Sequence, residues 1–203
     1  MPGSRPATPQ RPATPQSRPT TPTRGSVNVP MGSVAFIDTK TGAWVRYDSV
    51  GGANKATGTA TQNVGLRTSG MTTCFTVILV GTNGAVLSHV SAYLMNPTLN
   101  STQTAELKAM KEGFAKIYKD HGSKLSPLRV VLVPGPNTTD HNAMRRVVGL
   151  IFPQIPLTHA STCECRKAST LPTATPSRGT AQVMVSQGSA SGGNKVYVED
   201  LLA

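Results

Sequence analysis

The chain has 203 residues and a formal net charge of +11, with 37% hydrophobic and only 4% aromatic residues. No stretch approaches the ~20 apolar residues that cross a membrane, MPGSRPATPQ lacks the apolar core of a secretory signal, and three cysteines make a poor disulfide framework. These features exclude a membrane protein and a disulfide scaffold, and we expect a cytoplasmic protein. Nucleic acid is not the expected partner, because the charge is spread along the chain and aromatic residues that would stack on bases are scarce.

The chain begins with a proline-rich repeat. The sequence RPATPQ at 5–10 recurs unchanged at 11–16 and loosely as RPTTPT at 18–23. Such a segment cannot bury enough apolar surface to offset the entropy of ordering it, so we predict a disordered tail over 1–28 and one domain over 29–203. Its Thr-Pro dipeptides and proline spacing suit a proline-directed kinase or an SH3-like partner, and a plain flexible tether fits the same composition.

Two strand hairpins are predicted next. Residues 34–38 and 43–50 are rich in β-branched and aromatic side chains and flank a turn with glycine, and a loop rich in Gly, Ala and Thr follows at 51–63. The second hairpin joins FTVILV at 75–80 to AVLSHVSAYL at 85–94. Its first strand is apolar on both faces, which is typical of a central strand covered on both sides.

Two helices and three more strands are predicted in the second half of the chain. The first helix starts near a cap at Asn100, Ser101 or Thr102 and ends before Gly122, and the second runs from about 138–140 to Pro153. Strands are predicted at 128–133, between the helices, and at 182–186 and 195–201, as a closing hairpin after a linker at 168–180. This order predicts a layered α/β domain of the α+β type, with a largely antiparallel mixed sheet and two main helices.

Cys74 and His89 lie on the two strands of the second hairpin, where they could form a catalytic pair. A cysteine nucleophile needs a nearby base, and the base needs a third group that fixes its orientation. A two-residue turn at 83–84 would leave the two side chains on the order of 13 Å apart. A four-residue loop at 81–84 instead pairs Cys74 with Ser91 and puts His89 on the diagonal. In that register we predict the sulfur and the nearer ring nitrogen within ~4 Å, or one water, of each other.

The residues around this pair carry a resemblance to a known family. In Thr68-Ser69-Gly70-Met71-Thr72-Thr73-Cys74, followed by His89 and by helix, strand, helix and hairpin, the chain resembles the cysteine-dependent protein glutamine deamidase superfamily. Its members include the chemoreceptor deamidase CheD, the cytotoxic necrotizing factors and the Burkholderia lethal factor. The family usually carries Gly and Ser directly before the cysteine, where this chain has Thr72 and Thr73.

The resemblance implies a fold of the CheD type, a reaction and three site residues. Cys74 would be the nucleophile, His89 its base, and Thr68 the residue that helps to position the histidine. The thiolate would attack a glutamine side-chain amide, ammonia would leave, and water would release glutamate from the thioester. The expected partner is a protein with an exposed glutamine, and the reaction requires neither a metal nor another cofactor.

Three other interpretations fit parts of the sequence. Asp38 at a strand end and Glu106 on the first helix are similar to the metal-binding acids of ribonuclease H, a metal-dependent nuclease, although the strand at 128–133 does not end in another acid. His159, Cys163 and Cys165 have zinc-ligand chemistry but no evident fourth ligand. Finally, a catalytically degenerate domain of the same fold could act as a binding module.

Overall fold

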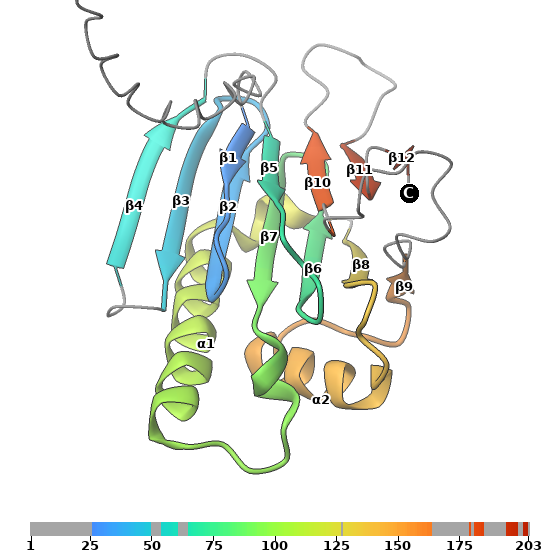
Figure 1. Ribbon diagram of the computed structural model, residues 1–203. Coiled ribbons are helices and arrows are strands. Elements are labelled where there is room, and N and C mark those ends of the chain that lie inside the picture. Colours follow the sequence, from blue (N-terminus) through green and yellow to red (C-terminus); the bar gives the residue numbers. More distant parts are fainter. Residues whose placement is uncertain are drawn as a thin grey trace, which may run out of the picture.

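The fold is a three-layer α+β arrangement with a mostly antiparallel main sheet and two helices. The computed structural model describes residues 26–49, 54–60, 65–126, 128–163, 179, 181–184, 194–198 and 201–202. Within these, a seven-stranded sheet in the order β4-β3-β2-β7-β6-β8-β9 carries the helices on one face, and a five-stranded sheet in the order β1-β5-β10-β11-β12 covers the other (Figure 1). All neighbours in the large sheet are antiparallel except β8 and β9.

The elements have the following bounds. The large sheet consists of β2 (Ser33–Asp38), β3 (Ala43–Asp48), β4 (Asn54–Thr59), β6 (Phe75–Val80), β7 (Gly84–Val90), β8 (Arg129–Pro134) and β9 (Ser161–Thr162). The small sheet consists of β1 (Ser26–Asn28), β5 (Gly65–Thr68), β10 (Ala181–Met184), β11 (Lys195–Val198) and β12 (Leu201–Leu202). The helices are α1 (Ser101–His121) and α2 (His141–Ile151), with short 3-10 turns η1 (Ala92–Met95) and η2 (Gly122–Leu125).

Both long helices begin at polar caps that the sequence predicts. Asn100 accepts a hydrogen bond from the backbone N–H of Gln103 at 2.9 Å, and the Gln103 side chain accepts one from the N–H of Asn100 at 3.0 Å. Asp140 accepts from the N–H of Ala143 at 2.8 Å. These bonds satisfy backbone N–H groups that have no partner within the first helical turn. Each helix therefore begins at the residue that follows its capping side chain. No helix in the described part of the chain is long and apolar enough to cross a membrane.

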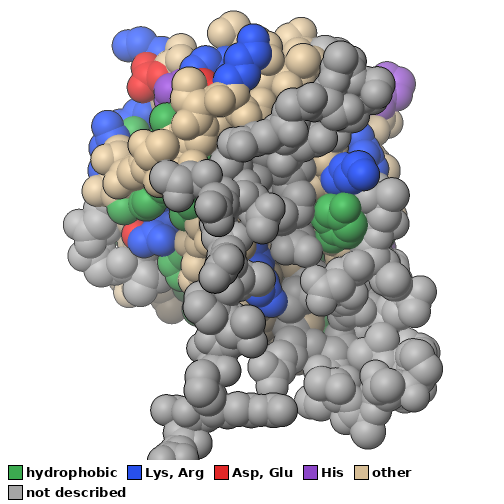
Figure 2. Space-filling model, turned by 90° about the horizontal axis from the view of Figure 1, so that it is seen from above, with side chains coloured by type: hydrophobic (Ala, Val, Ile, Leu, Met, Phe, Trp, Pro, Cys, Tyr) green, Lys and Arg blue, Asp and Glu red, His purple; other side chains and the backbone are tan. Residues whose placement is uncertain are grey.

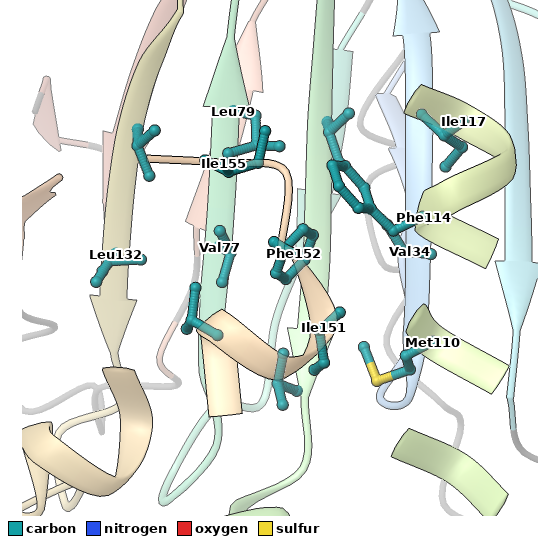
Figure 3. Close-up of a cluster of buried hydrophobic side chains, with 14 of the residues drawn as sticks. Val34, Val77, Leu79, Met110, Phe114, Ile117, Leu132, Ile151, Phe152 and Ile155 are labelled. Carbon is teal, nitrogen blue, oxygen red and sulfur yellow. The ribbon is translucent and has the colours of Figure 1, made fainter. Parts of the chain in front are cut away.

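The main core lies between the helices and the large sheet. Figure 3 shows side chains from α1 and from the end of α2 pointing toward strands β2, β6 and β8. The labelled members are Val34, Val77, Leu79, Met110, Phe114, Ile117, Leu132, Ile151, Phe152 and Ile155. A second apolar cluster, which includes Ile37, Leu66, Ile78, Leu87 and Val196, lies between the two sheets. β6 is therefore covered on both faces, as predicted from the apolar side chains that it carries on both faces.

Three sequence-based expectations about strands are wrong. Residues 26–28, assigned to the tail, form β1, which pairs in parallel with β5. The predicted loop at 51–63 contains β4, whose Gly58 lies under the Trp44 ring so closely that a Cβ there would be 2.8 Å from it. The glycine that suggests a loop is thus required by cross-strand packing. The strand predicted to reach residue 94 ends at Val90, and η1 follows.

Residues 1–25, and with them the predictions of a disordered tail and its partner, lie outside the described residues.

Candidate functional site

The hairpin of β6 and β7 adopts the register that brings Cys74 and His89 together on one face. Val80 pairs with Ala85 and Thr76 with His89, so the loop has four residues and the position opposite Cys74 is Ser91. The N–H of Gly81 closes this loop by donating to the carbonyl of Gly84 at 2.9 Å. Cys74 packs against the cluster between the two sheets. His89 points to the same side. It lies two positions after Leu87 and four after Ala85 on β7, and residues at this spacing share one face of a strand with the members of that cluster.

Thr68 fixes the tautomer of His89. Its hydroxyl lies 2.8 Å from the Nδ1 atom of His89 and 2.8 Å from the carbonyl oxygen of Val29. A carbonyl can only accept, so the hydroxyl donates its one hydrogen to Val29 and must accept from Nδ1–H of the ring. The Nε2 atom is then a bare acceptor, and it is buried with no hydrogen-bond partner among the described residues.

The position of Thr68 explains how this contact forms. Thr68 is the last residue of β5 in the small sheet, whereas His89 lies on β7 in the large sheet, so the hydrogen bond crosses between the two layers. Both residues are buried, with exposed fractions of 0% for Thr68 and 4% for His89. Burial lowers the pKa of His89 to about 4, so the ring is neutral at pH 7.

The buried histidine should make stability depend on pH. Because the pKa of His89 is about 4 in the folded protein and 6.5 in the unfolded chain, the unfolded state binds more protons between these values, and acid favours unfolding. We expect the free energy of unfolding to fall by about 3 kcal/mol from this group as the pH drops from 7 to 4. Urea denaturation at several pH values measures this loss.

A His89→Gln variant provides the control for this prediction. In this variant most of the decrease in the free energy of unfolding between pH 7 and pH 4 should be absent. The part contributed by His121 should remain, because burial also lowers the pKa of that residue. Equal pH dependence in the variant and in the unmodified chain would contradict the assignment of the titration to His89.

The Cys74 thiol holds its proton in this structure. Burial raises the pKa of the thiol above its usual 9.0, and the negative charge of Glu106 raises this pKa further. A hydrogen bond from the N–H of Ala92 to the sulfur lowers the pKa in part. The sulfur lies 3.8 Å from the thioether sulfur of Met31, a residue that is 45% exposed. Among the described residues no direct hydrogen bond joins the thiol to His89, and the predicted approach of the sulfur to the ring nitrogen stays a prediction.

This thiol should therefore react with alkylating agents only in base. Because the thiolate is the reactive form, we expect the rate at which iodoacetamide modifies Cys74 to reach half its maximum above pH 9. Rates measured by mass spectrometry of digested protein, over a series of pH values, give this midpoint. A midpoint near pH 7 would show an activated thiolate and would contradict the resting state described above.

A buried carboxylate that the sequence did not assign to this site lies beside Cys74. Glu106 of α1 is 5% exposed and accepts hydrogen bonds from the Ser91 hydroxyl, at 2.7 Å, and from the Tyr93 hydroxyl. Burial and the Glu106 carboxylate raise the pKa of Tyr93. The helical periodicity of α1 does not predict that Glu106 is buried, because a glutamate interrupts the apolar face of the helix. Its hydrogen-bond partners, Ser91 and Tyr93, come from the segment after β7.

The alternative metal sites receive no support from the geometry. Asp38 lies opposite Gly84 at the far end of β2, where it accepts hydrogen bonds from Lys124 and two backbone amides, whereas Glu106 lies at the Cys74 end. Cys165 lies outside the described residues. Within the residues described, no group of three or more His, Cys, Asp or Glu side chains is arranged to hold a metal ion.

A pocket of about 370 Å³ lies at the end of the large sheet opposite Cys74. It is formed by the ends of β2 and α1 and by strands β3 and β4. In its wall the His121 ring stacks on the Phe36 ring, with 4.2 Å between the two ring centroids. Its other lining residues are Asp38, Thr41, Ala43, Trp44, Val45, Tyr47, Lys55, Thr57, Ile117, Asp120 and Lys124. Figure 2 views the molecule from this end and shows basic (Lys or Arg), acidic and histidine side chains gathered at one edge.

Comparison with known proteins adds no relative. No model of a protein family matches the chain, and no curated protein is significantly similar to it.

Proposed function

We propose that the protein is a glutamine deamidase of the CheD fold type, in which Cys74 is the nucleophile, His89 the general base and Thr68 the residue that orients the histidine. The bare Nε2 of His89 carries the proposal. A buried ring nitrogen without a partner is costly in a purely structural histidine, and here its tautomer is fixed by Thr68 on the face where the Cys74 thiol lies.

The proposed reaction begins from a neutral thiol and a neutral imidazole. As the sulfur bonds to the amide carbon of a glutamine side chain, the thiol proton passes to Nε2 of His89. The tetrahedral intermediate then collapses, the carbon–nitrogen bond breaks, and the imidazolium returns the proton to the leaving group, which departs as ammonia. Water attacks the resulting thioester with His89 as base, which releases glutamate and restores the thiol.

The resting geometry requires a change when substrate arrives. The pKa of the thiol is raised and that of His89 is lowered, so an ion pair does not form unaided. Met31 lies on the thiol and is the exposed side chain that an incoming glutamine would displace. Active-site hydrogen bonds are often formed only in the substrate complex, and this site fits that pattern. The substrate we propose is a protein, with its glutamine on an exposed segment.

The proposal is tested on intact proteins. A total cell extract is incubated with the unmodified chain or with the Cys74→Ser variant, and glutamine-to-glutamate conversion is mapped by mass spectrometry. We expect one or a few glutamines to be converted only by the unmodified chain. Identical maps for both proteins, at enzyme concentrations comparable to those of the substrates, would count against a deamidase.

A second candidate function is that of a binding module without catalysis. It is favoured by the protonated thiol, which has no hydrogen bond to His89, and by the pocket at the opposite end of the sheet. The chain's single tryptophan, Trp44, lines that pocket and can report on occupancy. Quenching of its fluorescence by a fragment library of small aromatic compounds, lost in Thr57→Arg and unchanged in Cys74→Ser, would favour this function.

A further inference from the structure

A loop that follows β8 holds the segment before β6 by its carbonyl groups. The N–H of Gly135 donates to the carbonyl of Cys74 and the N–H of Asn137 to that of Thr72, both at 2.9 Å. The hydroxyl of Thr138 lies 2.8 Å from the carbonyl oxygen of Thr73 and 3.1 Å from that of Cys74. Three consecutive carbonyls that lead into the thiol are therefore bound by one loop, which we call the 135–138 clamp.

The clamp is closely packed. A Cβ at Gly135 would lie 2.7 Å from the carbonyl oxygen of Cys74 and 2.8 Å from those of Met71 and Thr72, so any other residue would push the two segments apart. Thr138 is 8% exposed, although its side chain is polar and its neighbour Thr139 is exposed. Its hydroxyl is the one side-chain group of the clamp that bonds to the Cys74 segment, and a buried hydroxyl keeps such bonds because losing them leaves polar groups unpaired.

The clamp also determines where the amide groups of this segment point. In a planar trans peptide the C=O of one residue and the N–H of the next face in opposite directions. Because the carbonyls of Thr72 and Thr73 face the clamp, the N–H groups of Thr73 and Cys74 face away from it. Neither N–H has a hydrogen-bond acceptor among the described residues. Free N–H groups beside a nucleophile are the donors that stabilise a developing oxyanion.

We propose that Thr138 is a positioning residue of the Cys74 site, an inference that rests on the proposed deamidase function. Its hydroxyl holds the carbonyls of Thr73 and Cys74, and so fixes both the thiol and the two N–H groups that face away from the clamp. The hydroxyl of Thr138 bonds to backbone carbonyls. It acts through the backbone of the segment that carries the nucleophile.

The test compares Thr138→Val with Thr138→Ser and with Thr139→Val, the matched change at the exposed neighbour. With a glutamine substrate found in the extract, we expect Thr138→Val to lower kcat about 10-fold with KM nearly unchanged, since positioning matters in the transition state. Serine should restore most of kcat, because it keeps the hydroxyl, and Thr139→Val should match the unmodified chain. An unchanged kcat in Thr138→Val, or an equal loss in Thr138→Ser, would overturn the proposal.

A second readout does not depend on turnover. Loosening the clamp should expose the thiol and remove part of the burial that raises its pKa, so the alkylation midpoint of Cys74 in Thr138→Val should move down toward pH 9 and its rate rise several-fold. Thr139→Val should show neither change. If the unmodified chain converts no glutamine, the deamidase proposal fails, and alkylation alone then decides whether Thr138 positions Cys74. Alkylation of Thr138→Val that is indistinguishable from that of the unmodified chain would overturn the positioning role.

Discussion

Replacing Cys74 by serine is expected to lower the rate of glutamine deamidation by on the order of 10⁴-fold or more, with little loss of stability. The side chain is only half-buried, and serine nearly matches its size, so packing against the cluster between the sheets should be preserved. A hydroxyl is a much weaker nucleophile than a thiol, and a base whose pKa is about 4 cannot activate it. Ammonia release from a substrate peptide, followed with time, measures the rate.

Cys163 offers the matched control for this variant. It packs against the same cluster as Cys74 and is also half-buried, but it lies just after β9, on the far side of β8 from the thiol. Cys163→Ser should deamidate at the rate of the unmodified chain. Comparable losses in the two variants would point to damaged packing rather than to a missing nucleophile.

Replacing His89 by alanine should lower the deamidation rate roughly 10³-fold, because the variant loses the group that we propose accepts the thiol proton and returns it to ammonia. Thr68→Val should follow the same direction with a smaller effect, about 10²-fold, since the ring remains but its tautomer is no longer fixed. Thr68→Ser keeps the hydroxyl and should recover most of the activity. Rates are measured with the same peptide at pH 7.

The control for the histidine is His121→Ala. His121 is also an imidazole packed in the fold, stacked on Phe36, but at the end of the sheet opposite Cys74. Its removal should leave the deamidation rate unchanged once protein stability is matched by temperature. A rate for His89→Ala within a factor of about three of the unmodified chain would exclude its role as the base.

The parts of the fold that the sequence predicts are those whose signals are local. The caps at Asn100 and Asp140 set the starts of both helices, and the apolar run at 75–80 marks the central strand. The hairpin register could be narrowed to two possibilities, of which only the four-residue loop is compatible with a catalytic pair. The observed pairing of Val80 with Ala85 is that register.

The features that the sequence misses depend on partners distant in the chain. Strand β5 has only four residues, and it is held by β10, more than a hundred positions later. Glu106 is buried because the hydroxyls of Ser91 and Tyr93 bond to its carboxylate. The 135–138 clamp includes Gly135 and Pro136 of a Pro-Gly-Pro sequence that predicts only a strand end. The family resemblance pointed to Thr68 as a partner of His89, but the buried Nε2 and the protonated thiol follow from tertiary packing.

Trapping the acyl-enzyme tests the role of Cys74 most directly. The unmodified chain is mixed with a substrate peptide in water enriched in heavy oxygen, quenched in acid during turnover, and analysed by mass spectrometry. We expect a peptide thioester on Cys74 through the former glutamine side chain, and one heavy oxygen in each glutamate formed. Glutamate formed without any adduct on Cys74, or formed equally fast by Cys74→Ser, would contradict covalent catalysis at this site.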